Sequence, residues 1–186
     1  LKAQNCRRGI DLLLNFCDQN DITYDMCGKV IIATRDEELK TLDILYDNGM
    51  ENGIKGLKRL SVDELQEYEP HAVGLSALYC PETGIIDFLQ VCRKLSKNIQ
   101  EKGEVKTGAA VINIEERPDG IKVATETSEY ETRFLINCAG LFSDQVAELA
   151  GVERQVRIVP FRGEYYILKR QAKHLVKNLI YPVPDT

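Results

Sequence analysis

The stretch that decides the fold is FLINCAGLFSD, which runs from Phe134 to Asp144. Its apolar half predicts a buried strand over 134–138, and Ser143 with Asp144 predicts the start of a helix that ends at Gly151. The small residues between them let a ligand approach the backbone, and a helix N-terminus offers free N–H groups. This order is typical of a nucleotide-binding strand–loop–helix unit, but a tight connection without a ligand has the same pattern.

Helices alternate with short strands before this stretch. Apolar residues at helical spacing predict a helix over 2–20, and the run KVIIAT predicts a buried strand over 29–34. Helix starts are indicated where a capping residue is followed three positions later by Glu or Gln, namely at Thr34 with Glu37, Ser61 with Glu64, and Asp87 with Gln90. They predict helices over 34–48, 62–68 and 88–101, with a further strand over 74–80.

An antiparallel meander is expected in the second half of the chain. Strands are predicted over 104–106, 109–115, 121–126 and 129–133, and the turn Pro118-Asp119-Gly120 joins the middle two as a hairpin. A longer strand-like segment covers 156–168, split by Pro160 and Gly163. The mixture predicts an α/β or α+β fold.

Composition excludes several classes of protein. The 186 residues correspond to one domain, or two small interleaved ones, at ~150 residues per domain. Lys and Arg number 24 against 29 Asp and Glu, without a basic cluster, which argues against binding of nucleic acid. No apolar run approaches the ~20 residues that cross a bilayer.

The six cysteines are scattered and form no C-x-x-C pair, and there are only two histidines, so no metal site is expected. Buried, reduced thiols in a reducing compartment such as the cytoplasm are the simplest interpretation.

Three further places could carry chemistry. Gly84 in the segment Thr83–Asp87 permits a close or left-handed backbone, although a plain turn followed by a helix cap has the same residues. Arg162 suits a carboxylate, or else a surface ion pair. His71 is a weak candidate for a general base, because most histidines are not bases.

These residues carry a resemblance over nearly the whole chain. The segments that carry it are EPHAVGLSALYCPETGIIDFLQVC (69–92), FLINCAGLFSDQVAELAG (134–151), RIVPFRGEYYIL (157–168) and LVKNLIYPVPD (175–185). Together they resemble the FAD-dependent oxidoreductases of the D-amino-acid-oxidase-like superfamily, and within it the branch that acts on L-2-hydroxyglutarate. The resemblance implies part of a Rossmann-like FAD-binding domain (1–20 and 87–151) interleaved with part of an antiparallel-sheet substrate domain (21–86 and 152–186).

The resemblance also implies roles for individual residues. The backbone of Val111 would read the adenine, and the Thr83–Asp87 segment with Gly84 would lie where the flavin and substrate domains meet. Cys138, Ala139 and Gly140 would pack against the FAD diphosphate and ribitol. Residues implied to face the substrate, by their place in or near the strand that leads into its domain, are Arg162, Tyr165 and Tyr181.

The chain departs from the family pattern because it has no G-x-G-x-x-G loop. Leu1 matches the family just after a flavin-contacting loop, so we expect an internal portion of a longer enzyme that neither binds FAD tightly nor turns over alone. The implied reaction oxidises a small 2-hydroxy acid, L-2-hydroxyglutarate, with FAD as cofactor and oxygen or a quinone as electron acceptor, and it leaves peripheral membrane association open. The alternatives are a related amine or glycerol-phosphate oxidoreductase, and a non-catalytic remnant that acts as a binding module.

Overall fold

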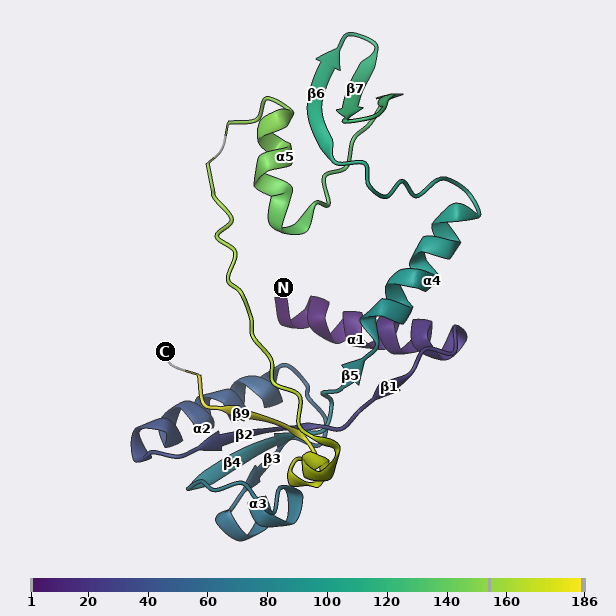
Figure 1. Cartoon of the computed structure of the whole chain (residues 1–186). Coiled ribbons are helices and arrows are strands. Elements are labelled where there is room, and N and C mark those ends of the chain that lie inside the picture. The colour runs from purple at the N-terminus through teal and green to yellow at the C-terminus, as the bar shows by residue number, and fades with distance from the viewer. Residues whose placement is uncertain (1, 154, 185–186) are drawn as a thin grey trace. The chain divides into compact units, whose positions relative to one another are not determined.

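The computed structural model describes residues 2–153 and 155–184 (Figure 1). Its contacts divide the chain into two units, Leu1–Asn98 with Ile167–Thr186, and Ile99–Tyr166. Both helices and sheets are present, which confirms the predicted mixed α/β class.

A four-stranded sheet forms the centre of the first unit. Its order is β3 (Lys58–Leu60), β4 (Ser76–Cys80), β2 (Lys29–Ala33) and β9 (Leu179–Pro182). β4 is antiparallel to both its neighbours, whereas β9 lies parallel to β2. Two of these strands, β2 and β4, were predicted from their β-branched and alternating residues, and β3 and β9 were not.

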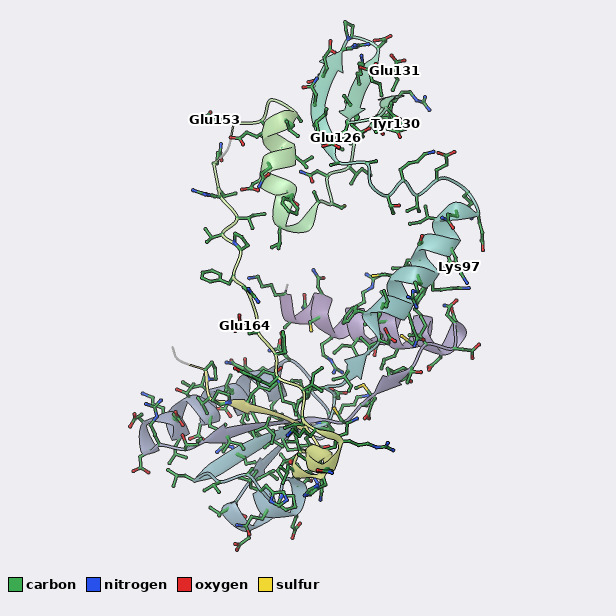
Figure 2. All side chains as sticks on the ribbon, in the orientation of Figure 1. Lys97, Glu126, Tyr130, Glu131, Glu153 and Glu164 are labelled. Atoms are coloured by element: carbon green, nitrogen blue, oxygen red, sulfur yellow. The ribbon has the colours of Figure 1, made fainter. Side chains whose placement is uncertain are left out.

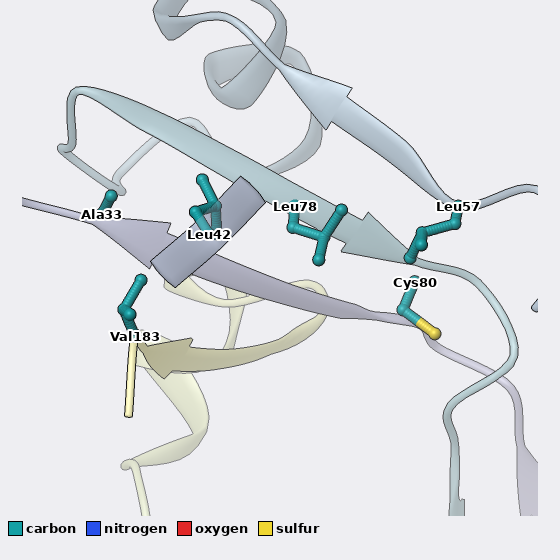
Figure 3. Close-up of a cluster of buried hydrophobic side chains, with 6 residues drawn as sticks. All are labelled: Ala33, Leu42, Leu57, Leu78, Cys80 and Val183. Atoms are coloured by element: carbon teal, nitrogen blue, oxygen red, sulfur yellow. The ribbon is translucent and has the colours of Figure 1, made fainter. Parts of the chain in front are cut away.

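Each face of this sheet is covered by a helix. On one face, α2 (Asp36–Glu51) inserts Leu42 among side chains of the sheet and its flanks, and Figure 3 shows this cluster of Ala33, Leu42, Leu57, Leu78, Cys80 and Val183. On the other face, α3 (Val62–Tyr68) packs Leu65 against Val30, Ile32, Leu60 and Ala77. A short 3-10 helix, η2 (Arg170–Leu175), precedes β9.

A second core in this unit joins two helices. α1 (Lys2–Gln19) and α4 (Phe88–Gln100) meet through Cys17, Ile22 and Val91, which are all buried. A two-stranded pairing of β1 (Tyr24–Asp25) with β5 (Ile85–Ile86) lies beside them and contributes Tyr24 and Ile86 to the cluster. The helix predicted over 2–20 is confirmed.

The second unit contains a three-stranded antiparallel meander. Its strands are β6 (Val111–Arg117), β7 (Gly120–Thr125) and β8 (Glu129–Thr132), in that order. The turn at Pro118–Gly120 makes the predicted hairpin, and Ile114 and Val123 face each other in its core. η1 (Gly140–Phe142) and α5 (Ser143–Leu149) follow, which confirms the predicted helix after Ser143.

Three predicted strands are wrong: residues 104–106, 134–138 and 156–168 belong to no strand. A strand exists only where a neighbour completes its hydrogen bonds, and no described residue pairs with these segments. Their apolar side chains stay exposed, with Phe134 81% and Ile136 84% accessible. Figure 2 labels Glu164 in the last of these three segments, 156–168, which is extended and contains no helix or strand.

The start of α2 differs from its prediction by one position. The N-cap is Arg35, and the side chain that returns to the cap belongs to Glu38 rather than Glu37. The helix also continues past Gly49 to Glu51. Helix propensity at one glycine is therefore overridden by packing, because Gly49 is buried beside Leu57.

The expectation of buried thiols holds for two cysteines. Cys17 and Cys80 are buried, whereas Cys6, Cys92 and Cys138 are exposed. Cys138 is exposed for the same reason as Phe134, since the predicted buried strand that would carry it has no neighbour among the described residues. The assignment of 1–20 and 87–151 to a flavin domain, and of 21–86 and 152–186 to a substrate domain, stays a prediction.

Candidate functional site

His71 lines a cavity of about 370 Å³ on the α3 side of the four-stranded sheet. It follows α3 directly, after Glu69 and Pro70. The cavity is mostly apolar, and its lining comes from three segments distant in sequence: Ile32 and Thr34 at the end of β2, residues 71–73, and residues within 175–182. The ring of His174 lies edge-on to His71, with 6.0 Å between centroids.

Tyr181 lies in β9 and also lines this cavity, but its ring is turned to the other face of the sheet. Along a strand successive side chains alternate, and Tyr181 pairs with Ile31, whose side chain packs on the α2 face. The ring there lies under the ammonium of Lys29, with 5.6 Å from Nζ to the centroid. The side chains of His71 and Tyr181 therefore belong to opposite faces of one sheet.

Glu69, two residues before His71, is a buried charged residue that was not among the predicted site residues. Its side chain is fully buried (0% accessible), and its carboxylate accepts hydrogen bonds from the backbone N–H groups of Lys177 and Asn178. A signal was present in the sequence: an acidic residue at a helix C-terminus faces the negative end of the helix dipole, so it needs another partner. Glu69 is the C-cap of α3.

Gly84 is required by a close approach of two strands. Its φ is not among the positive values, so the left-handed alternative is wrong. A Cβ at this position would lie 2.5 Å from the carbonyl oxygen of Asp25 and 2.7 Å from Sδ of Met26. The neighbouring Asp87 caps α4 as predicted, accepting from the N–H groups of Leu89 at 3.0 Å and of Gln90 at 3.1 Å.

The Asp87 cap also has an electrostatic consequence. Hydrogen bonds from Gln90, first from its backbone and then from its side chain, hold the pKa of the Asp87 carboxyl below its ordinary value. This aspartate stays ionised at neutral pH and stabilises the first turn of α4. It has the character of a structural anion.

The loop Cys138–Gly140 in the second unit has the features of a nucleotide-contacting turn. Asn137 brackets it, because its Oδ1 accepts from the N–H of Ala139 at 3.1 Å and its Nδ2 donates to the carbonyl of Ser143 at 2.8 Å. Gly140 has a φ of +58°, and nothing lies within 4 Å of where a Cβ would stand.

These features fit part of an FAD site. Small side chains and open space at Gly140 leave the backbone of the loop accessible to a phosphate or sugar. Val111 begins β6 and pairs with Thr125, next to an irregularity in the register that separates it from Asn113. The residue that this irregularity leaves without a partner in the ladder is Ile112, directly after Val111.

Arg162 and Tyr165 lie in the extended segment of the second unit, and both are strongly exposed. The Nε of Arg162 lies 3.4 Å from Oε1 of Glu164, its neighbour two residues on. The segment is tied to α5 where Asp144 Oδ2 accepts a hydrogen bond from the N–H of Ile158 at 3.1 Å. Arg162 thus has a guanidinium that water still reaches, as a binding group for an anion requires.

The predicted site residues therefore fall into two groups. His71, Tyr181 and Gly84 lie in the first unit, and Val111, Cys138, Ala139, Gly140, Arg162 and Tyr165 lie in the second. Among residues 2–153 and 155–184, no cluster of three or more His, Cys, Asp or Glu side chains could hold a metal ion. None of the helices within those ranges is both long enough and apolar enough to span a membrane.

The chain is similar to known proteins along its whole length. It is 43% identical to an L-2-hydroxyglutarate dehydrogenase of Indibacter alkaliphilus and 41% identical to the mitochondrial L-2-hydroxyglutarate dehydrogenase of Bos taurus. All of this chain is covered in both, but only 47% and 43% of the relatives. The chain thus spans under half the length of these curated relatives.

Solved structures show the same fold at lower identity. An L-α-glycerophosphate oxidase of Mycoplasma pneumoniae with FAD bound matches 98% of this chain and 50% of its own with a TM-score of 0.78 at 22% identity. An L-proline dehydrogenase of P. horikoshii matches 95% of this chain and 48% of its own with a TM-score of 0.76 at 14% identity. A family model described as FAD dependent oxidoreductase (DAO) matches residues 1–186. The chain belongs to this DAO family of FAD-dependent oxidoreductases.

Proposed function

We propose that the whole protein of which this chain forms a part oxidises L-2-hydroxyglutarate to 2-oxoglutarate with FAD. The observation that carries the proposal is the 43% identity over the full chain to a protein named L-2-hydroxyglutarate dehydrogenase. The segments that contain the candidate residues lie within that match, which covers all of the chain.

Within this chain, the loop Cys138–Gly140, the backbone of Val111 and the Gly84 segment would hold the cofactor. FAD, when bound there, would supply a two-electron acceptor suited to hydride from the substrate C2. For the oxidation to balance, the proton of the C2 hydroxyl must leave to a base as the carbon–oxygen double bond forms. His71 is our candidate for that base, because a ring nitrogen of an imidazole can accept a proton.

The substrate carries two carboxylates, so its site needs cationic groups or N–H donors. Arg162 is our candidate for one of them, because a planar guanidinium binds a carboxylate through two parallel hydrogen bonds. Tyr165 is proposed to contribute a hydroxyl donor. Tyr181 is proposed to do so only for a substrate bound on the α2 face of the sheet, opposite His71. In Tyr181 the ring is already oriented by the ammonium of Lys29.

The test is anaerobic addition of L-2-hydroxyglutarate to the purified full-length protein while the flavin absorbance is followed. We expect bleaching with the L form and none with the D form, with 2-oxoglutarate as the product. Bleaching by an N-methyl amino acid or by glycerol phosphate instead would establish the related oxidoreductase. A full-length protein that stays colourless after FAD is supplied would be the non-catalytic binding module.

We propose oxygen or a quinone as the electron acceptor, with peripheral membrane contact as one route to a quinone.

We propose a cytoplasmic location. A reducing environment of this kind fits the six cysteines, which are all free. The bovine and human relatives are named mitochondrial. Fractionation of the native cells, followed by immunodetection, would separate these locations.

A further inference from the structure

Glu69 joins two of the three segments that line the cavity beside His71. One of them, residues 71–73, follows Glu69 after Pro70. The second comes from residues within 175–182, and Lys177 and Asn178 of that stretch donate their backbone N–H groups to the Glu69 carboxylate. The N–H of Lys177 lies 3.0 Å from Oε1 and 3.2 Å from Oε2. One buried side chain thus spans 108 residues of sequence to hold the cavity together.

The contacts around Asn178 extend this arrangement to β2. The Nδ2 of Asn178 donates to the carbonyl of Cys27, and the N–H of Leu179 donates to the carbonyl of Gly28 at 3.0 Å. β9 then runs parallel to β2, from Lys29 beside Leu179. Because β9 has β2 as its one neighbour among the described strands, its position depends strongly on how this segment is anchored.

The chemistry at this point calls for a carboxylate. A carboxylate only accepts hydrogen bonds and offers about four lone-pair positions, which suits N–H donors that converge on it. A glutamine side chain has the same shape, but it would turn its NH2 group toward one of these N–H donors. Burial of a charge is tolerated only where hydrogen bonds of this kind compensate it, and a plain packing role at Glu69 would not need the charge.

We propose that Glu69 is a positioning residue of the active site: it sets the distance between the His71 segment and β9, and so the shape of the cavity between them. This inference rests on the proposed function, because it takes the His71 cavity as part of the substrate site. It assigns Glu69 no contact with substrate.

The test uses the full-length holoenzyme with Glu69→Gln, and Glu67→Gln as the matched control. Glu67 is exposed on the same helix, so its variant keeps the charge change and loses no buried contact. Hydrogen exchange at the amides of 177–181 is expected to be about tenfold faster in Glu69→Gln alone, since lost anchoring lowers the local opening free energy. This readout requires no substrate.

Kinetics separates positioning from general stability. In Glu69→Gln we expect KM for L-2-hydroxyglutarate to rise roughly tenfold while kcat changes less, because the binding geometry is loosened. Ser61→Ala removes the N-cap of the same helix and serves as a destabilised control with unchanged KM. Where Glu69→Gln does not fold, Asn178→Ala removes the bond to Cys27 and is expected to act in the same direction.

The outcomes distinguish this inference from the proposed function. Unchanged exchange at 177–181, or a KM within twofold of wild type, overturns the role of Glu69. A wild-type protein whose flavin L-2-hydroxyglutarate does not reduce overturns the proposed function instead. The exchange measurement then still decides whether Glu69 holds β9 beside the His71 segment.

Discussion

The carboxylate of Glu38 accepts a hydrogen bond from the backbone N–H of Thr34 at 2.7 Å, across the start of α2. The Nε of Arg35 donates a hydrogen bond to Oε1 of the same carboxylate at 2.8 Å. These hydrogen bonds, from Thr34 first and then from Arg35, lower the pKa of Glu38 to about 2. The charged form of Glu38 therefore ties the end of β2 to the first turn of the helix.

Glu38→Gln is expected to lower the midpoint of urea unfolding at pH 7. A carboxyl group whose folded pKa lies below its ordinary value of 4.5 contributes stability above that value, and loses it as the pH falls toward the folded pKa. The difference between wild type and variant should thus shrink between about pH 4.5 and pH 2. Glu37→Gln, on the exposed neighbour, should change little at any pH. A difference that stays constant down to pH 2 would contradict this assignment.

Gly84→Ala is expected to destabilise the β1–β5 pairing. The added Cβ would meet the carbonyl oxygen of Asp25 at 2.5 Å, so a backbone must move. Gly9→Ala is the matched control, since nothing lies within 4 Å of its Cβ and α1 is helical there. It should stabilise the protein by about 0.5–1 kcal/mol, because alanine is the better helix former. Thermal unfolding should show a lower melting temperature for Gly84→Ala and a higher one for Gly9→Ala. Equal shifts in the melting temperature would refute the close approach at Gly84.

Leu65→Ala is expected to cost about 2–5 kcal/mol of unfolding free energy. Leu65 is fully buried between α3 and the sheet, where its removal leaves a cavity beside Val30 and Ala77. Leu12→Ala, at a leucine of α1 that is 59% accessible, should cost far less. Urea unfolding of the two variants checks the contrast, and similar losses would mean that Leu65 is not a core residue.

Elements with local signals were predictable from the sequence. The Ser61–Glu64 capping box is present as expected, with Glu64 N donating to Ser61 Oγ at 3.3 Å and Ser61 N to Glu64 Oε2 at 2.8 Å. The turn before Gly120 likewise makes its hairpin. Such signals act within a few residues, so one sequence suffices to read them.

Features that depend on distant partners were not predictable. The strand expected at 134–138 has the right composition but no neighbour among the described residues. Conversely, β9 forms because β2, about 150 positions earlier, pairs with it. The partner of Glu69 lies 108 residues away, and nothing in the local pattern names it. Likewise, the sequence placed Tyr181 near a substrate but could not show that its ring lies under Lys29.

Arg162→Gln is expected to raise KM for L-2-hydroxyglutarate in the full-length enzyme by roughly 10–100-fold, the loss of one charge-assisted hydrogen-bonded contact. Arg162→Lys should recover part of this, since the charge remains but the paired geometry does not. Arg8→Gln, at an exposed arginine of α1, is the control and should leave KM unchanged. Steady-state kinetics decides the point, and a KM within twofold for Arg162→Gln would remove Arg162 from the substrate site.

Cys17 is expected to be the slowest of the free cysteines to react with iodoacetamide. It is fully buried between α1 and α4, and burial, with a smaller contribution from Asp18, raises the pKa of its thiol. The thiolate is the reactive form, so both effects lower its rate at neutral pH. Exposed Cys6 and Cys92 should be alkylated first, and mass spectrometry of peptides at timed intervals gives the order. In urea, which unfolds the chain, Cys17 should react as fast as Cys6. Equally rapid labelling of Cys17 in the folded protein would contradict the prediction and show that the α1–α4 core opens.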